Sequence, residues 1–231
     1  MTLQKTTREY KAYKILQHWK RAKKTFPPEE LFDKKNLYYP LFQYLFKITK
    51  DLYSDLPKRK NGEKAFVHPI NIVLALKEAN ITDEIVLCGG LIHDYVEEKV
   101  DIYKRENKIE LNKKGIKTLD DYEVVVFEKL EKELNDICSK LNLDKIIIKK
   151  LINVTKLLTR HKRDYYFQSI SNIFNFSEDE ITHRALLIKL SDRMHNILCI
   201  DCFNEEERIY QCFKNLFLLN SAKKFIIEKY G

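Results

Sequence analysis

Apolar residues recur at steps of three and four along most of this chain, the spacing that one face of an α-helix requires. The pattern is clear in two early segments, at Leu41, Leu45, Ile48 and Leu52 and then at Ile70, Val73 and Leu74. Among its 231 residues the chain has only 5 Gly and 5 Pro, so it offers few turn signals. We therefore expect an all-α protein, a bundle of long helices joined by short loops.

Local chemistry places two helix starts. Pro69 fits the first turn of a helix, where proline is best tolerated. Residues 82–84, Thr-Asp-Glu, supply capping groups before an apolar run. That run contains Gly89 and Gly90, each of which costs roughly 1 kcal/mol of helix propensity relative to alanine. We expect close approach of neighbouring helices as the compensation.

Residues 99–136 differ in character, because they are rich in charge and have few apolar side chains before Val124. We expect an irregular, charged surface insertion here, inside a single domain of residues 1–231. Helical spacing then resumes, and another helix is expected to begin near residues 177–180 and to continue into Asp192.

The net charge of +8 is concentrated at the amino-terminal end. Residues 1–24 contain eight basic side chains against one acidic side chain, Glu9, so the rest of the chain is close to neutral. A basic arm of this kind can bind nucleic acid or an acidic membrane surface. We favour the alternative of an amphipathic helix that faces water with its lysines and packs on the body with Tyr10, Tyr13, Leu16 and Trp19.

The five cysteines are odd in number and scattered, which argues against a disulfide framework. Cys199 and Cys202 form a CxxC pair, but no second pair completes a zinc site, so we expect thiols buried in a helix. No apolar run approaches the roughly 20 residues of a membrane span, and residues 1–10 lack the apolar core of a signal peptide. These features predict a cytoplasmic protein with no membrane partner.

A His-Asp doublet, His93-Asp94, is the strongest chemical signal in the chain. It is matched by His68, 25 positions before His93, and by Asp192, 98 positions after Asp94. Two imidazoles and two carboxylates suit a borderline-hard divalent ion such as Mn²⁺, Fe²⁺ or Zn²⁺. The sequence thus predicts that the fold brings three segments together around one metal ion.

Further carboxylates follow the doublet. On a continuous helix Asp94 would lie beside Glu98, and His93 beside Glu97, so that like charges would repel unless a cation were near. Bound metal would relieve this conflict and leave Glu97 or Glu98 free for proton transfer.

Polar groups suited to phosphate lie in other segments. Asn196 shares a helix face with Asp192 and can hold a water molecule or a phosphate, whereas His195 is expected to be a packing or supporting histidine. Arg59-Lys60, in a loop before His68, can bind phosphate through the guanidinium fork.

Three stretches together resemble the HD superfamily of metal-dependent phosphohydrolases: His68-Pro69, residues 93–98 (His-Asp-Tyr-Val-Glu-Glu) and residues 189–196 (Lys-Leu-Ser-Asp-Arg-Met-His-Asn). More narrowly, they are similar to the hydrolase domain of the RelA/SpoT type, which removes pyrophosphate from the 3′ position of (p)ppGpp using Mn²⁺. The resemblance covers residues 40–220 apart from 99–136. It implies an HD-type helical bundle with the charged insertion.

The resemblance also implies a role for each site residue. The implied metal ligands are His68, His93, Asp94 and Asp192. Glu97 matches the catalytic glutamate, helped by Glu98, which stands where the family usually has aspartate. Asn196 and Arg59 match residues that bind the nucleotide and its phosphate, with Lys60 and Arg160 as further phosphate-binding residues. Leu198 and Cys199 depart from the family's Arg-Thr at these positions.

The leading function is therefore hydrolysis of a (p)ppGpp-like 3′-pyrophosphate by a metal-activated water, with Mn²⁺ as the expected metal. One alternative is an HD phosphatase that acts on another nucleotide, such as a nucleoside monophosphate, or on another phosphorylated small molecule. A second is a nucleic-acid-binding protein that uses residues 1–24. The sequence does not indicate an oligomeric state.

Overall fold

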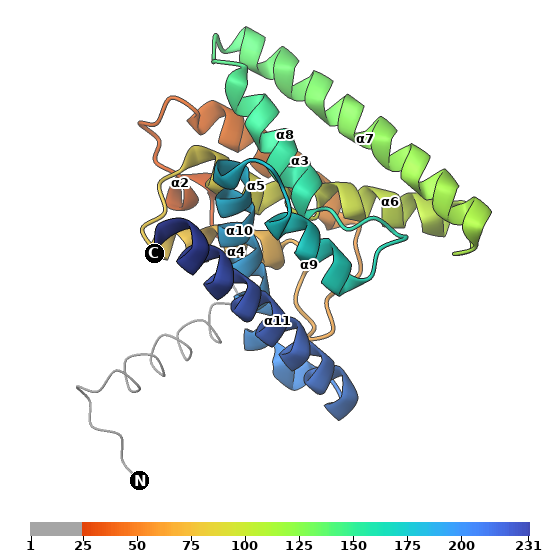
Figure 1. Ribbon diagram of the computed structural model, residues 1–231. Helices are drawn as coiled ribbons and strands as arrows, with labels where there is room; N and C mark the ends of the chain where they lie inside the picture. The colour runs from red at the N-terminus through yellow and green to blue at the C-terminus, as the bar shows by residue number, and fades with distance from the viewer. Residues whose placement is uncertain (1–24) are drawn as a thin grey trace.

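A computed structural model describes residues 25–231, and the basic arm of residues 1–24 lies outside these described residues. The described part is helical and contains no strand, which confirms the all-α prediction (Figure 1). The helices are α2 (Pro28–Leu31), α3 (Tyr39–Ser54), α4 (Val67–Glu78), α5 (Glu84–Ile92), α6 (Tyr95–Glu106), α7 (Lys113–Lys140), α8 (Ile146–Leu158), α9 (Tyr166–Phe174), α10 (Asp179–Leu198), the short 3₁₀ helix η1 (Ile200–Cys202) and α11 (Glu205–Tyr230).

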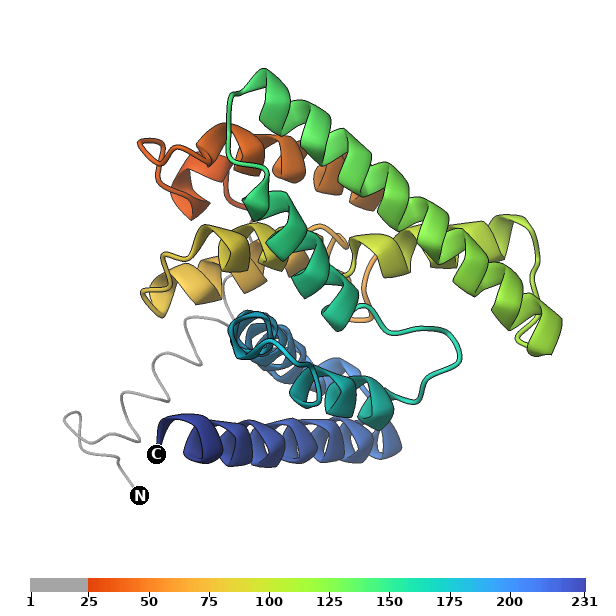
Figure 2. The ribbon, with the colours of Figure 1, turned by 45° about the horizontal axis from the view of Figure 1, so that its top comes forward.

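Helix α5 is at the centre of the bundle. Every residue from Ile85 to Ile92 is buried, and the helix packs against α3, α4, α8 and α10. The two longest helices, α7 and α11, lie on opposite sides of these inner helices in both views (Figures 1 and 2). The core therefore surrounds the segment that leads directly into His93 and Asp94.

Helices α4, α5 and α10 begin where the capping residues and proline of the sequence predict. Asp83 caps α5, since its Oδ1 accepts hydrogen bonds from the backbone amides of Ile85 and Val86 at 2.9 and 3.0 Å. Pro69 lies in the first turn of α4, and α10 begins at Asp179, close to the expected start.

The two glycines of α5 mark close helix approaches, as expected. A Cβ atom at Gly89 would lie 2.7 Å from Cδ1 of Ile188 in α10, and one at Gly90 would lie 3.2 Å from side-chain atoms of Val73 and Leu76 in α4. A Cβ atom at either position would force neighbouring side chains of α4 or α10 to shift, so glycine suits these close approaches. These approaches hold the helices of the candidate site together.

The expected irregular structure of residues 99–136 is wrong. This stretch forms the end of α6 and most of α7, and the short connection between the two helices carries most of its irregular backbone. One face of α7 enters the core through Leu119, Val126, Phe127, Leu130 and Leu134. The charged residues lie on the other faces of α7 and outnumber the apolar residues of its buried face. The composition of this segment therefore suggested a loop, although the apolar spacing is helical. Both the single domain and the insertion stay predictions.

The CxxC cysteines are not buried within a helix as expected. Cys199 is the C-cap of α10 and Cys202 ends η1, both are half-buried, and all five cysteines are free thiols. Among residues 25–231, no helix is both long enough and apolar enough to cross a membrane.

Candidate metal centre

Three separate segments bring the predicted ligands together. His68 lies in the first turn of α4, His93 and Asp94 form the turn between α5 and α6, and Asp192 lies in α10. The assumption of a continuous helix through the doublet is wrong, because α5 ends at Ile92 and Asp94 is the N-cap of α6. This break turns both side chains of the doublet toward His68.

The potential ligand atoms are close to one another. One ligand atom each from His68, His93 and Asp94 lies within 4.8 Å of the other two. Nε2 of His93 is 2.9 Å from Oδ2 of Asp94, and Nε2 of His68 is 3.7 Å from the same oxygen. Asp192 joins this group through His68, whose Nε2 lies 3.3 Å from its Oδ1.

The hydrogen bonding of His93 presents a free lone pair to this cluster. Its Nδ1 lies 2.9 Å from the carbonyl oxygen of Gly90, which accepts only if Nδ1 carries the proton. In the neutral ring Nε2 is then unprotonated, and within residues 25–231 this buried atom lies 2.9 Å from Oδ2 of Asp94 without a hydrogen-bond partner. A buried, unbonded imidazole nitrogen that faces carboxylates fits a metal ligand, and the backbone carbonyl supports its orientation.

The carboxylates of the cluster are held in the ionised form. Burial opposes the charge of Asp94, but the nearby His93 and a hydrogen bond from His68 lower its pKa. Burial likewise opposes the charge of Asp192, whereas Lys189 and His68 keep its pKa well below the usual range. Two anionic carboxylates and two imidazoles form a donor set that fits a divalent metal ion.

Lys189 also contacts the candidate site, although its sequence pattern indicated no role. Its Nζ lies 3.0 Å from Oδ2 of Asp192, three residues further along α10. Burial opposes its charge, but Asp192 and Asp94 raise its pKa. A lysine within an apolar helix stretch gave no signal beyond its three-residue spacing from Asp192.

Glu97 and Glu98 lie beside the ligands and resist ionisation. Burial, followed by the charge of Asp94, raises the pKa of each glutamate to about 7. Oε1 of Glu97 lies 3.6 Å from Nε of Arg160, so the structure brings Arg160 to the site as well. A carboxyl group with a pKa near neutrality can both accept and donate a proton.

Asn196 and Arg59 continue the site on the other side of Asp192. Nδ2 of Asn196 donates to Oδ1 of Asp192 at 2.6 Å, and Nη2 of Arg59 donates to Oδ1 of Asn196 at 3.0 Å. Gly62, with a φ of 81°, allows the tight turn that carries Arg59. Lys60 is not part of this group, because its ammonium pairs with Glu207 and lies over the ring of Phe203.

Two further groups face the cluster. His195 is buried, as expected of a supporting histidine, and its Nδ1 lies 2.9 Å from Nδ1 of His68. Burial and the nearby positive charge of His68 lower the pKa of His195 to about 3. The hydroxyl of Tyr53 in α3 is buried and unpaired within the described chain, and burial followed by the charges of Asp94 and Glu98 raises its pKa. No motif marked Tyr53, which has the ordinary spacing of a core residue.

Three curated proteins show how this chain is related to known ones. It is 30% identical over 155 residues to the probable guanosine-3′,5′-bis(diphosphate) 3′-pyrophosphohydrolase of Mycoplasma pneumoniae, a match that covers 65% of the chain and 17% of that protein. The protein of the same name from Mycoplasma genitalium is 29% identical over 62% of the chain and 16% of its own length. The guanosine-3′,5′-bis(diphosphate) 3′-pyrophosphohydrolase of Aquifex aeolicus is 24% identical over 78% of the chain and 21% of its own length.

The matches with these relatives cover only 16% to 21% of the relatives' length. No family model matches the chain, and no solved structure matches it. The likeness to these relatives thus rests on the sequence similarity, together with an all-α bundle that brings His68, His93, Asp94 and Asp192 together from three segments. Over 62% to 78% of its length, the chain is similar to proteins named as guanosine-3′,5′-bis(diphosphate) 3′-pyrophosphohydrolases, and its described part is an all-α bundle of the kind expected of an HD domain.

Proposed function

We propose that this protein is a metal-dependent phosphohydrolase that removes pyrophosphate from the 3′ position of guanosine 3′,5′-bis(diphosphate) or a closely related nucleotide. The observation that carries the proposal is the buried cluster of His68, His93 and Asp94 with a glutamate of raised pKa beside it. The printed names of the relatives supply the substrate class.

The ligands of the proposed metal are His68, His93, Asp94 and Asp192. Nitrogen and oxygen donors in equal number, without sulfur, favour a borderline-hard ion, and we propose Mn²⁺ as the metal used. A divalent ion bound there would supply positive charge that acidifies water and neutralises a phosphoryl oxygen. Lys189 holds Asp192 ionised and in place by its contact with Oδ2.

Glu97 is the proposed proton-transfer group. In hydrolysis, water oxygen bonds to the phosphorus attached to the 3′ oxygen, and the bond between that phosphorus and the 3′ oxygen breaks. Glu97 takes the proton that the water loses and delivers one to the 3′ oxygen, which leaves as a hydroxyl group. Its pKa of about 7 suits both roles near neutral pH, and Arg160 fixes the carboxylate in position.

Phosphate binding is assigned to the cations on the two sides of the ligands. Arg59 and Asn196 lie together beside Asp192, and Arg160 lies beside Glu97. A guanidinium group on each side can hold separate parts of a molecule with two diphosphate groups. Lys60 could join Arg59 only after its ammonium leaves Glu207.

The test is a substrate panel assayed with the purified full chain and Mn²⁺. Guanosine 3′,5′-bis(diphosphate) should release pyrophosphate and leave a 3′ hydroxyl, whereas nucleoside monophosphates should release little phosphate. Glu97→Gln should retain metal but lose about 100-fold or more in turnover, the usual contribution of general acid–base catalysis. Asp192→Ala should lose both metal and turnover.

Two results would contradict the proposal. Faster release of phosphate from a nucleoside monophosphate would favour the other HD phosphatase activity considered above. Equal turnover by Glu97→Gln, at matched metal content, would assign Glu97 to structure.

A further inference from the structure

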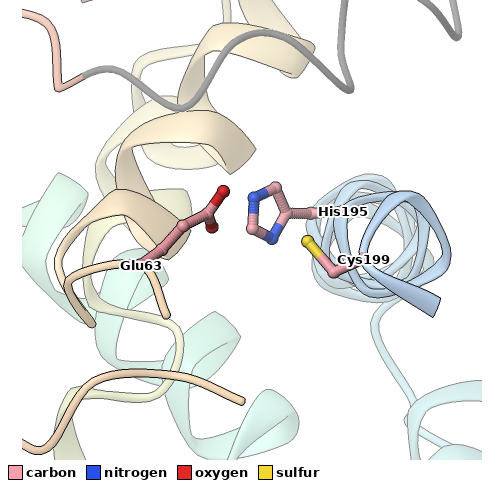
Figure 3. Close-up of side chains that lie close together, drawn as sticks. All are labelled: Glu63, His195 and Cys199. Atoms are coloured by element: carbon pink, nitrogen blue, oxygen red, sulfur yellow. The ribbon is translucent and has the colours of Figure 1, made fainter. Parts of the chain in front are cut away.

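A second group of potential ligands lies next to the first. Figure 3 shows Glu63, from the turn before α4, facing the imidazole of His195 in α10, with the thiol of Cys199 at the end of the same helix. One carboxylate oxygen, one ring nitrogen and the sulfur of these residues lie within 4.8 Å of one another. Ligands of one tetrahedral zinc ion stand roughly 3.5 Å apart, so small side-chain rotations would complete the site.

Two observations on Glu63 and Cys199 favour a cation between them. Oε2 of Glu63 is buried and has no hydrogen-bond partner among residues 25–231, an arrangement that is costly for a carboxylate. The sulfur of Cys199 accepts a hydrogen bond from Nδ2 of Asn61 at 3.1 Å, and Asn61 also accepts one from the backbone amide of Glu63. The turn thus holds the carboxylate and the thiol side by side.

We propose that Glu63, His195 and Cys199 form a second divalent-metal site, selective for a thiophilic ion of the Zn²⁺ type. The thiolate gives this preference, because sulfur binds zinc far better than it binds manganese. Binding would displace the thiol proton of Cys199. Three protein ligands leave the fourth position of a tetrahedral ion open to water or to a phosphate oxygen.

The test is a Co²⁺ titration of the metal-free full chain, with a phosphine reductant present. Cobalt bound by a thiolate gives an intense near-ultraviolet charge-transfer band, which should appear in the unmodified protein. Cys199→Ser should abolish the band, whereas Cys202→Ser should keep it, since Cys202 is also half-buried but its sulfur donates to the carbonyl of Cys199. Glu63→Gln should keep the band but require more Co²⁺.

A missing band in the unmodified protein, or one that survives Cys199→Ser, would overturn the second site itself. These readouts do not depend on turnover. Failure of the hydrolase proposal would leave the band and its cysteine dependence unchanged, so the two failures are distinguishable.

Discussion

Asp94, Glu97 and Glu98 concentrate negative charge in a site that water reaches poorly. The first of these is held ionised by histidines, while the other two have pKa values of about 7 because of burial and the charge of Asp94. Each glutamate therefore lowers the stability of the metal-free fold once it ionises. Carboxyl groups with strongly raised pKa values, which lower the stability of the fold when they ionise, are typical of binding and catalytic sites.

Glu98→Gln should stabilise the metal-free protein at neutral and higher pH. The pKa of Glu98 is raised from 4.5 to about 7 on folding, so the folded state holds this proton more tightly than the unfolded chain between those values. Stability that is present below pH 4.5 is therefore lost as the pH rises through 7. We expect the variant to gain on the order of 2 kcal/mol at pH 8 and close to nothing at pH 4.

Urea unfolding at the two pH values measures this difference. Glu106→Gln is the matched control, because Glu106 lies at the end of the same helix with an exposed side chain. An equal gain for Glu98→Gln at pH 4 and pH 8 would contradict the electrostatic explanation.

At this scale the sequence predicted the ligand candidates but not their surroundings. His68, His93, Asp94 and Asp192 were predicted because two imidazoles and two carboxylates suit a divalent ion and lie in stretches that resemble the HD superfamily. Lys189 and Tyr53 were missed because lysine and tyrosine fit ordinary helical patterns, and only the fold turns them toward the carboxylates. Lys60 was expected to face phosphate, but a partner on α11, Glu207, binds its ammonium.

Helix α5 shows how local sequence and packing cooperate. Its cap at Asp83 and its apolar length were readable, whereas its end at Ile92 was not, because the residues after it have good helix propensity. Tertiary contacts of the doublet override that propensity. The same limit applies to residues 99–136, where a narrow apolar stripe on α7 was hidden by charge.

Gly89→Ala should destabilise the protein although alanine favours helices. The new methyl group would lie 2.7 Å from Cδ1 of Ile188, a fully buried side chain of α10. Overpacking costs about 1–3 kcal/mol, which exceeds the roughly 1 kcal/mol gained in helix propensity. Thermal or urea unfolding should show a net loss.

The matched control is Gly89→Ala in an Ile188→Val background, which removes the clashing Cδ1 atom. There the alanine should be close to neutral or stabilising. Equal losses in both backgrounds would place the clash elsewhere than at Ile188.

On the scale of the whole molecule, the candidate site joins distant parts of one chain. Its proposed ligands come from α4, the turn between α5 and α6, and α10, which pack against one another around the core. In the unfolded chain His68 and Asp192 are separated by more than a hundred residues, so the ligand set exists only in the folded state. Metal binding and folding should therefore be linked.

Mn²⁺ should raise the melting temperature of the full chain, and a chelator should reverse the change. At a free concentration 100 times the dissociation constant, a ligand specific for the folded state adds about 2.7 kcal/mol, or roughly 5–10 °C for a protein of this size. Asp192→Ala should remove the Mn²⁺-dependent rise in melting temperature, because it removes the proposed ligand that α10 contributes. Asp121→Asn, an exposed carboxylate of α7, should keep it. A full response in Asp192→Ala would show that α10 contributes no ligand, and the metal would then be held by the segments near His68 and His93 alone.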